Sequence, residues 1–195
     1  MTISTDTRFY AACLESYNNG RLHGAWIDAT GDAEEMGKAV EAMLKASPYP
    51  HAEEWAIHDY DDEHGLISHF GEYGGVDHIA EVMAAMEGLE DDYNDAILPL
   101  LINWVSDKVS EPSEWASILQ DSFLGTYTDA EDYAIESSEG SMGDIPDHIK
   151  NYIDFKEMAR DWALNGMDFI CLSTGSSIQD YDSMRGRECI ALNNH

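Results

Sequence analysis

DAEEMGKAVEAMLKASPYP, residues 32–50, contains the start, the buried face and the end of one helix. Asp32 is followed three residues later by Glu35, the spacing of a capping box, in which two side chains satisfy backbone N–H groups of the first turn. Pro48 and Pro50 end the helix, because proline cannot continue it. Helical periodicity places the buried stripe at Met36, Val40, Met43 and Leu44.

Short strand candidates lie on both sides of this helix. Residues 9–14 and 25–27 combine aromatic and small apolar residues, and a Tyr-Asn-Asn-Gly turn signal lies between them at residues 17–20. Residues 54–58 are a third candidate, because their Trp and Ile fit a strand better than a polar loop. The first part of the chain is therefore predicted to form a sheet with one helix.

A helical region follows a polar, glycine-containing loop at residues 59–75. Apolar residues at helical spacing predict helices over residues 76–83, 93–104 and 110–119. Pro99 is expected to kink or break the second of them. The three helices together predict a small bundle.

The last third of the chain has mixed helix and strand signals. Thr128 and Glu131 form a capping-box pair that opens one helix, and helical spacing continues over residues 145–162 up to a glycine stop at Gly166. Two strand candidates, with a loop at residues 173–177 between them, lie at residues 167–172 and 188–192. The predicted fold class of the whole chain is α+β.

The negative charge of the chain is concentrated in its middle. The sequence has 39 Asp and Glu against 10 Lys and Arg, a net charge of -29. Residues 46–149 contain 25 of these acids and one base, Lys108, which leaves a surplus of 24 negative charges. Such a surplus destabilises the compact state by self-repulsion, so it needs a functional reason. At the charge spacing of duplex DNA, ~1.7 Å, 24 charges correspond to roughly 40 Å, or about 12 base pairs.

Several of these acids have the spacing of one helix face. Like charges at i,i+4 destabilise a helix by about 0.2–0.5 kcal/mol per pair, whereas interleaved Lys would stabilise it. An ordinary solvated face is the alternative for any single helix. Three sets show the spacing: Glu87, Asp91 and Asp95; Asp77 and Glu81; and Asp107, Glu111 and Glu114.

The charge pattern favours a non-catalytic protein whose carboxylates imitate DNA phosphates in the DNA-binding groove of another protein. Carboxylates bind Arg bidentately, as phosphates do, and association should be fast and strongly dependent on salt. We call the candidate partner-binding acids the central acids. They are Asp59, Asp61, Asp62, Glu63, Glu72, Asp77, Glu81, Glu87, Glu90, Asp91, Asp92, Asp95, Asp107, Glu111, Glu114, Asp121, Asp129, Glu131, Asp132 and Glu136.

A metal site is the rival hypothesis for the middle of the chain. The candidate ligands are residues 58–64 with His69, Glu72, Asp77 and His78. They do not fit a calcium-binding EF-hand loop starting at Asp59, because His64 and Phe70 stand where that loop requires Gly and Glu. An acidic loop with incidental histidines is the plainer interpretation.

Other function classes find less support. The chain has no phosphate-binding glycine loop and no nucleophile motif, so neither enzyme activity nor a cofactor is expected. Adaptation of an unrelated protein to high salt would spread acids evenly, whereas the residues flanking 46–149 are nearly balanced in charge. Three widely spaced cysteines predict reduced thiols and a cytoplasmic protein. Neither a membrane nor a nucleic acid is an expected partner of so acidic a chain.

Several stretches of the chain resemble the ArdA family of antirestriction proteins. They are AWID at 25–28, EWAIHDY at 54–60, GTYTDAEDY at 125–133, IPDHIKNYID at 145–154, MARDW at 158–162 and GMDF at 166–169. The resemblance extends over nearly the whole chain, and its middle is alike mainly in acidity.

The resemblance implies a fold, a partner and a motif. It implies an elongated homodimer of three small domains: a sheet with one helix (1–62), an acidic helical domain (63–125) and a mixed C-terminal domain with the dimer interface (126–195). It also implies inhibition of type I restriction-modification enzymes, by filling the DNA groove of the methyltransferase core. The antirestriction motif of the family would correspond to Ile145, Pro146, Asp147, Tyr152, Ile153, Asp154, Met158, Ala159, Arg160 and Asp161.

Overall fold

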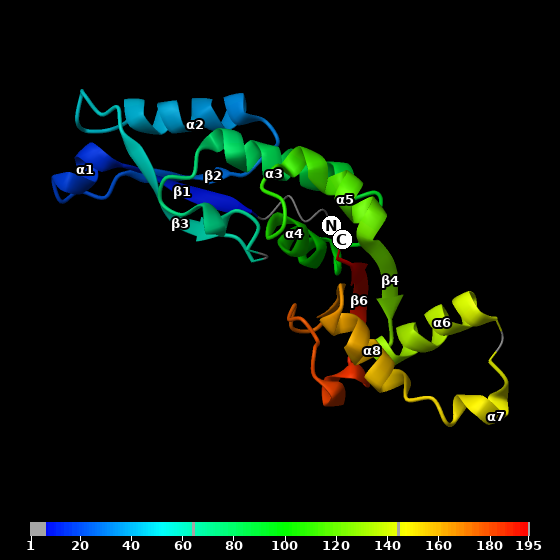
Figure 1. The fold of residues 1–195 in the computed structure, drawn as a ribbon. Helices are drawn as coiled ribbons and strands as arrows, with labels where there is room; N and C mark the ends of the chain where they lie inside the picture. The colour runs from blue at the N-terminus through cyan, green and yellow to red at the C-terminus, as the bar shows by residue number, and fades with distance from the viewer. Residues whose placement is uncertain (1–6, 64, 144, 195) are drawn as a thin grey trace. The chain divides into compact units, whose positions relative to one another are not determined.

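The computed structural model describes residues 7–63, 65–143 and 145–194, and it confirms the predicted α+β class (Figure 1). The chain divides into unit 1 (Met1–Ala116) and unit 2 (Ser117–His195). Within the described residues, each unit contains one three-stranded antiparallel sheet. The finer division into three domains stays a prediction.

The sheet of unit 1 contains the three predicted strands in the order β2-β1-β3. These are β1 (Arg8–Cys13), β2 (Gly24–Asp28) and β3 (Trp55–Asp61). The prediction ended the third strand at His58, which is too early. The register shifts between Tyr10 and Ala11, and beyond the shift Tyr10 pairs with Asp59 and Arg8 with Asp61. The first acids of the expected loop therefore belong to the strand.

The connection from β1 to β2 contains a short helix that the sequence signals did not predict. This helix, α1 (Leu14–Asn18), contains the first two residues of the predicted turn, and Gly20 at the end of that turn has a φ of 72°. The left-handed region that this angle occupies favours glycine, which explains the Asn-Gly pair at the turn. The chain therefore turns at Asn19 and Gly20, but Tyr17 and Asn18 belong to a helix that was not predicted.

Residues 32–50 contain the predicted helix, which is α2 (Ala33–Lys45). Asp32 caps it by accepting hydrogen bonds from the backbone N–H groups of Glu34 and Glu35. The reciprocal half of the capping box is replaced, because the Asp32 N–H donates its hydrogen bond to the hydroxyl oxygen of Thr30, at 3.3 Å. The predicted stripe is confirmed at Met36, Val40 and Met43, which are buried, while Leu44 is half-buried.

Three α-helices and two short 3-10 helices complete the middle of the chain. They are η2 (Ser68–Phe70), α3 (Val76–Leu89), α4 (Leu98–Ser106), η3 (Pro112–Glu114) and α5 (Trp115–Ser122). The helix predicted over 93–104 begins only at Leu98, so Pro99 does not kink it but lies buried in its first turn. Proline fits that position, since the first N–H groups of a helix have no partner within it.

Unit 2 is built on a sheet with the order β4-β6-β5. Its strands are β4 (Phe123–Tyr127), which was not predicted, β5 (Met167–Cys171) and β6 (Cys189–Asn193). Although β6 was the weaker strand candidate, it is the central strand and every residue of Cys189–Leu192 is buried. The predicted strands over 167–172 and 188–192 are confirmed, and the second of them pairs with both other strands of the sheet.

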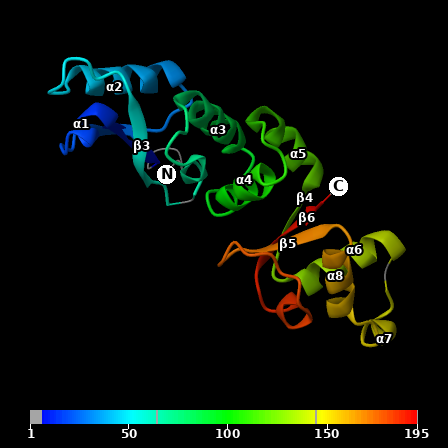
Figure 2. The same cartoon turned by 60° about the vertical axis from the view of Figure 1, so that its left-hand side comes forward.

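The helices of unit 2 are α6 (Ala130–Met142), α7 (Asp147–Lys150), α8 (Phe155–Leu164) and the short 3-10 helix η4 (Tyr181–Met184). Figures 1 and 2 show α6 and α8 packed beside the sheet, where alanines of both helices join one core with Phe169, Cys171 and Cys189. Asp129 caps α6, one residue later than the Thr128 of the predicted capping box. The helical spacing noted over 145–162 corresponds to two helices, α7 and α8, and Asp154 caps the second of them.

No helix in the described ranges is both long and apolar enough to cross a membrane.

Candidate partner-binding surface

The central acids are mostly surface residues. Sixteen of the twenty are exposed, and the four half-buried ones are Asp62, Glu90, Asp129 and Glu131. Among the described residues, the ion pairs of the exposed sixteen join Asp61 to Arg8 and Glu81 to His78. Within the part of the chain that the structure describes, the other exposed carboxylates form no ion pair with a cation.

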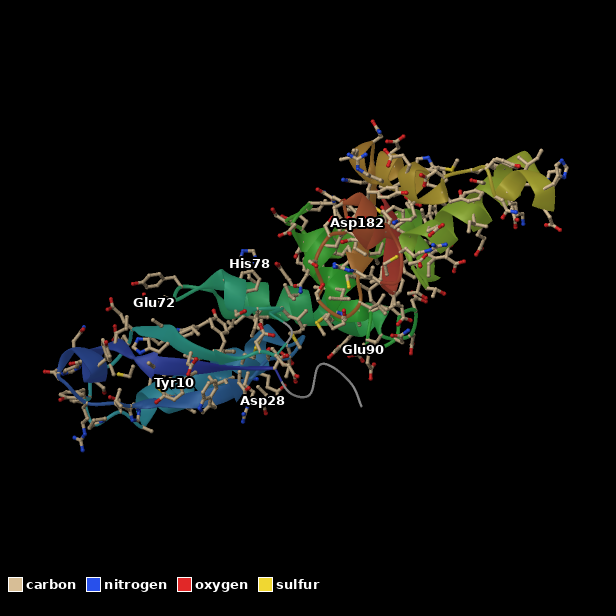
Figure 3. The ribbon with its side chains drawn as sticks, turned by 90° about the horizontal axis from the view of Figure 1, so that it is seen from below. Tyr10, Asp28, Glu72, His78, Glu90 and Asp182 are labelled. Carbon is tan, nitrogen blue, oxygen red and sulfur yellow. The ribbon has the colours of Figure 1, made fainter. Side chains whose placement is uncertain are left out.

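In unit 1, acids lie on the solvent side of α3 and on the segments around it. Asp77 and Glu81 are one helical turn apart on α3, as predicted, and the carboxylate of Glu81 is 3.1 Å from Nδ1 of His78. Figure 3 shows Glu72 and His78 along one margin of unit 1 and the half-buried Glu90 toward the opposite margin. Exposed acids of this unit therefore lie on α3 and also on the segments before and after it.

Two of the three predicted helical rows are wrong. Helix α3 ends at Leu89, so Glu87 lies on it while Asp91 and Asp95 lie on the turns that follow. Those turns are fixed by Asn94, whose Oδ1 accepts hydrogen bonds from the N–H groups of Ala96 and Ile97. This local bonding competes with helix, as Asn side chains commonly do.

The row at Asp107, Glu111 and Glu114 is the second one that fails, because its residues do not belong to one helix. Asp107 is the C-cap residue of α4, and Glu111 is the N-cap residue of the 3-10 helix η3. All three carboxylates are exposed, so they lie on the surface although they do not share one helix.

Three of the four half-buried central acids bond to other groups of the protein. One oxygen of Asp62 accepts hydrogen bonds from the N–H groups of Ile67 and Ser68, at 2.8 and 2.9 Å, and closes the loop after β3. Asp129 caps α6 and also accepts from the N–H of Gly186 at 2.8 Å. Glu131 pairs with Arg185 at 2.6 Å. A count from sequence therefore overestimates the carboxylates available to a partner.

Unit 2 contributes three exposed central acids: Asp121 on α5, and Asp132 and Glu136 on α6. Next to Glu131 and Asp132, a shallow cavity of about 240 Å³ also touches Asp129 and Arg185. Arg185 pairs with Glu131, so one of the three negative charges at this cavity is neutralised within the fold.

The residues that resemble the antirestriction motif divide into core and surface. Ile145 and Ile153 pack against the core of unit 2, Ala159 is fully buried, and Met158 accepts a hydrogen bond from the Ser138 hydroxyl at 3.2 Å. These four residues therefore build unit 2.

Other motif residues face solvent or fix local structure. Asp154 caps α8 and accepts a hydrogen bond from the Tyr181 hydroxyl, while Arg160 pairs with Glu157 at 2.7 Å. Tyr152 is 89% exposed, the most exposed large apolar side chain of the described residues. The remaining exposed members are Pro146, Asp147 and Asp161.

The metal-site hypothesis gains no support from the described residues. Among them, no group of three or more His, Cys, Asp or Glu side chains could hold a metal ion. His64 and the side chain of His69 lie outside what the structure describes. Asp62 is engaged with backbone N–H groups and His78 with Glu81, so two of the other candidate ligands have protein partners.

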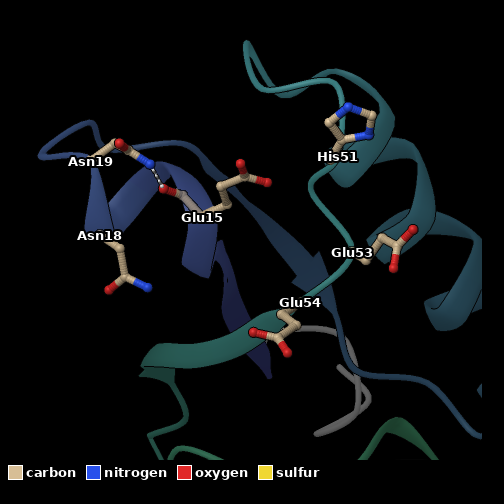
Figure 4. A pocket seen from close by; sticks show the side chains of 6 residues that line it. All are labelled: Glu15, Asn18, Asn19, His51, Glu53 and Glu54. Atoms are coloured by element: carbon tan, nitrogen blue, oxygen red, sulfur yellow. Dashed lines mark hydrogen bonds between the residues drawn. The ribbon is translucent and has the colours of Figure 1, made fainter.

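A cavity that sequence reasoning missed lies in unit 1 (Figure 4). It has a volume of about 420 Å³, and segments far apart in sequence line it, so no local pattern could have indicated it. Asn19 is fixed there by a hydrogen bond from its amide to the Glu15 carbonyl at 2.8 Å. The lining residues are Glu15, Asn18, Asn19, His51, Glu53 and Glu54.

These features define an acidic α+β protein whose exposed carboxylates are its most distinctive surface. The family model for antirestriction protein (ArdA) matches residues 9–176, so the chain belongs to the ArdA antirestriction family. Members of this family are inhibitors that counteract restriction, and this chain is an antirestriction protein. A search of curated proteins found no match. The strand β6 lies beyond the matched residues, although it is the centre of the sheet in unit 2.

Proposed function

We propose that this antirestriction protein imitates duplex DNA and occupies the DNA-binding groove in the methyltransferase core of a type I restriction-modification enzyme. It would block restriction without catalysing a reaction. The observation that supports this most is the exposure of sixteen central acids, which ion pairs leave largely unneutralised. The resemblance of the chain to its family points to the same class of target.

The electrostatic argument starts from the groove. A groove that binds DNA is lined with Lys and Arg, and its affinity for phosphates falls steeply with salt. Exposed carboxylates form the same charge-assisted hydrogen bonds with Arg, and they are covalently attached to a folded chain. The surplus of 24 charges in residues 46–149 would replace the phosphates of about 12 base pairs.

Competition with DNA tests the proposal directly. We expect the protein to displace a labelled duplex from a purified type I methyltransferase core. The triple variant Glu87→Lys, Asp91→Lys, Asp95→Lys should raise the Kd roughly tenfold or more, or about 1.4 kcal/mol. All three side chains are exposed, so the fold should tolerate the change. Competition by this variant equal to that of the parent at moderate salt would show the proposal to be wrong.

A matched control separates position from total charge. Glu41→Lys, Asp182→Lys, Glu188→Lys changes the net charge equally, at exposed sites outside residues 46–149. We expect this control to retain most of the affinity. An equal loss in both variants would mean that only net charge matters. Restriction and methylation assays on the same samples would show whether modification is blocked as well.

We also propose that the protein acts as a homodimer through unit 2, which would extend the acidic surface. Large apolar side chains exposed on this unit, Tyr152 at 89% and Leu164 at 58%, support the idea. Light scattering should give twice the mass of the chain, and Tyr152→Asp with Leu164→Asp should reduce it to one chain. The control is Leu22→Asp in unit 1, an equally conspicuous apolar residue at 84% exposure. A monomeric parent would refute the dimer but not the DNA imitation.

A further inference from the structure

Two of the three cysteines lie opposite each other in the sheet of unit 2. Cys171 ends β5 and Cys189 begins β6, and the antiparallel register pairs them directly. Both are free thiols, and both belong to the same buried core. Since opposite residues of neighbouring strands point to the same face, their sulfur atoms lie on the same side of the sheet.

The hydrogen bonds beside the pair show which kind of cross-strand pair it is. The N–H of Leu172 donates to the carbonyl of Glu188, whereas the N–H of Cys171 donates away from β6, to the carbonyl of Ser176. Hydrogen-bonded and non-hydrogen-bonded pairs alternate along an antiparallel ladder, so Cys171 and Cys189 form a non-hydrogen-bonded pair. Such pairs have Cα atoms about 4.5 Å apart, within the range of about 4.4–6.8 Å that a disulfide spans.

The two thiols differ in their surroundings. The Ser173 hydroxyl, 3.2 Å from the sulfur of Cys171, and that of Thr174 lower the pKa of Cys171 to about 7. Burial raises the pKa of Cys189 to about 12, and the nearby Asp129 adds to the effect. Cys171 is therefore the thiol that reacts first with an oxidant. It lies next to the exposed loop at residues 173–177, whereas Cys189 lies in the core.

We propose that Cys171 and Cys189 form a reversible cross-strand disulfide when the protein meets a peroxide. The Cys171 thiolate attacks the O–O bond of hydrogen peroxide, which gives a sulfenic acid and releases hydroxide that is protonated to water. The sulfur of Cys189 then loses its proton, attacks the Cys171 sulfur and expels a second hydroxide, which becomes water. Two thiols lose two electrons in all, and one peroxide is reduced to two waters.

The bond would join the central strand β6 to the edge strand β5. It would close the loop between the two cysteines, which includes η4 and Ile178, a residue of the core of unit 2. Cross-linking restricts the unfolded chain more than the folded one, so the oxidised protein should be more stable. Reduction by thiols would reverse the effect.

Mass spectrometry of the whole chain tests this without any variant. After stoichiometric peroxide in non-reducing buffer, we expect the loss of two hydrogen atoms and a linked peptide pair containing Cys171 and Cys189. Reduction with dithiothreitol should restore the original mass. Thermal unfolding followed on the same samples should show a higher Tm for the oxidised form than for the reduced one. Oxygen addition at Cys171 with no linked peptide, or no reaction at all, would overturn the proposal.

Cys13 supplies a matched control. It is also buried, and its pKa is also lowered, since burial raises the pKa but the hydrogen bonds with Ser16, Ser47 and Glu15 together outweigh it. Trp55 and not a cysteine lies opposite Cys13. Cys13→Ser should therefore leave the loss of two hydrogens unchanged, while Cys171→Ser and Cys189→Ser should each abolish it. A bond that depends on Cys13 would contradict the assignment.

Discussion

At the scale of single residues, the acids of this chain perform two different tasks. Asp62 is one of the half-buried central acids, and it holds the N–H groups of Ile67 and Ser68. Its neighbour Glu63 is exposed. The two residues have the same charge and nearly the same position, so the contacts of the carboxylate separate a structural acid from a surface acid.

This difference gives a prediction for stability. Asp62→Ala leaves two backbone N–H groups without their acceptor, and the one on Ile67 belongs to a fully buried residue. We expect a loss of about 1–3 kcal/mol in the free energy of unfolding. Glu63→Ala should change it by less than about 0.5 kcal/mol, or stabilise slightly by relieving repulsion. Denaturant titrations of both variants measure the difference, and equal losses would refute the assignment.

The sequence was enough to locate the central acids, but it could not distinguish those that bond within the fold from those that face solvent. A carboxylate that caps a helix, as Asp129 does, and one that faces solvent, as Asp132 does, occur in the same run of acids. What distinguishes them is the N–H that each meets in three dimensions. That information depends on Gly186, more than fifty residues away, which donates to Asp129.

At the scale of elements, the elements that the sequence predicted well are those with local signals. The helix α2 has a capping residue, a buried stripe and terminating prolines within one stretch, and only its reciprocal cap differs. The charged row across Glu87, Asp91 and Asp95 failed because spacing alone assumes a continuous helix. The helix ends at Leu89, before Asp91, and the Asn94 side chain then bonds to the N–H groups of Ala96 and Ile97 in the turns ahead of α4.

The strand β6 shows the opposite case, in which a weak local signal has a large structural effect. Ala191 is fully buried in the core of unit 2, while Glu188, three residues earlier, is exposed. We predict that Ala191→Lys lowers the stability of unit 2 by roughly 3 kcal/mol or more, because it places an unpaired charge and excess volume in a packed core. Glu188→Lys should change stability by less than about 0.5 kcal/mol.

Hydrogen exchange resolved by peptide would check this prediction. Ala191→Lys should increase exchange across β4, β5 and β6 and leave α2 and β1 protected, because these belong to unit 1. Increased exchange in unit 1 alone, or none anywhere, would show that β6 does not stabilise unit 2 in this way. The comparison with Glu188→Lys controls for the added positive charge.

At the scale of the whole molecule, the net charge of -29 would govern how the protein meets the partner that we propose. We predict that the affinity for the methyltransferase core falls at least about tenfold between roughly 50 mM and 200 mM salt. The fall should be less steep than for duplex DNA, because part of the acidic surplus is held within the fold. Competition titrations over a salt series would measure both slopes.

The same salt series distinguishes two origins of the acidity. Adaptation to high salt would make the fold depend on salt, whereas DNA imitation requires a fold that persists without it. We expect circular dichroism to show a folded protein in low-salt buffer. Sequence could locate the surplus of charge, but self-repulsion, packing and exposure are properties of the assembled chain.

The place of β6 in the chain also bears on how the protein is made. The strands β1, β2 and β3 are complete once the ribosome has passed Asp61, so the first sheet can assemble early in translation. The second sheet lacks its middle strand until Cys189–Asn193 have been synthesised. A nascent chain would thus expose the unpaired edges of β4 and β5 until that point, and a product that terminated before β6 would retain a folded N-terminal unit beside an open, aggregation-prone one.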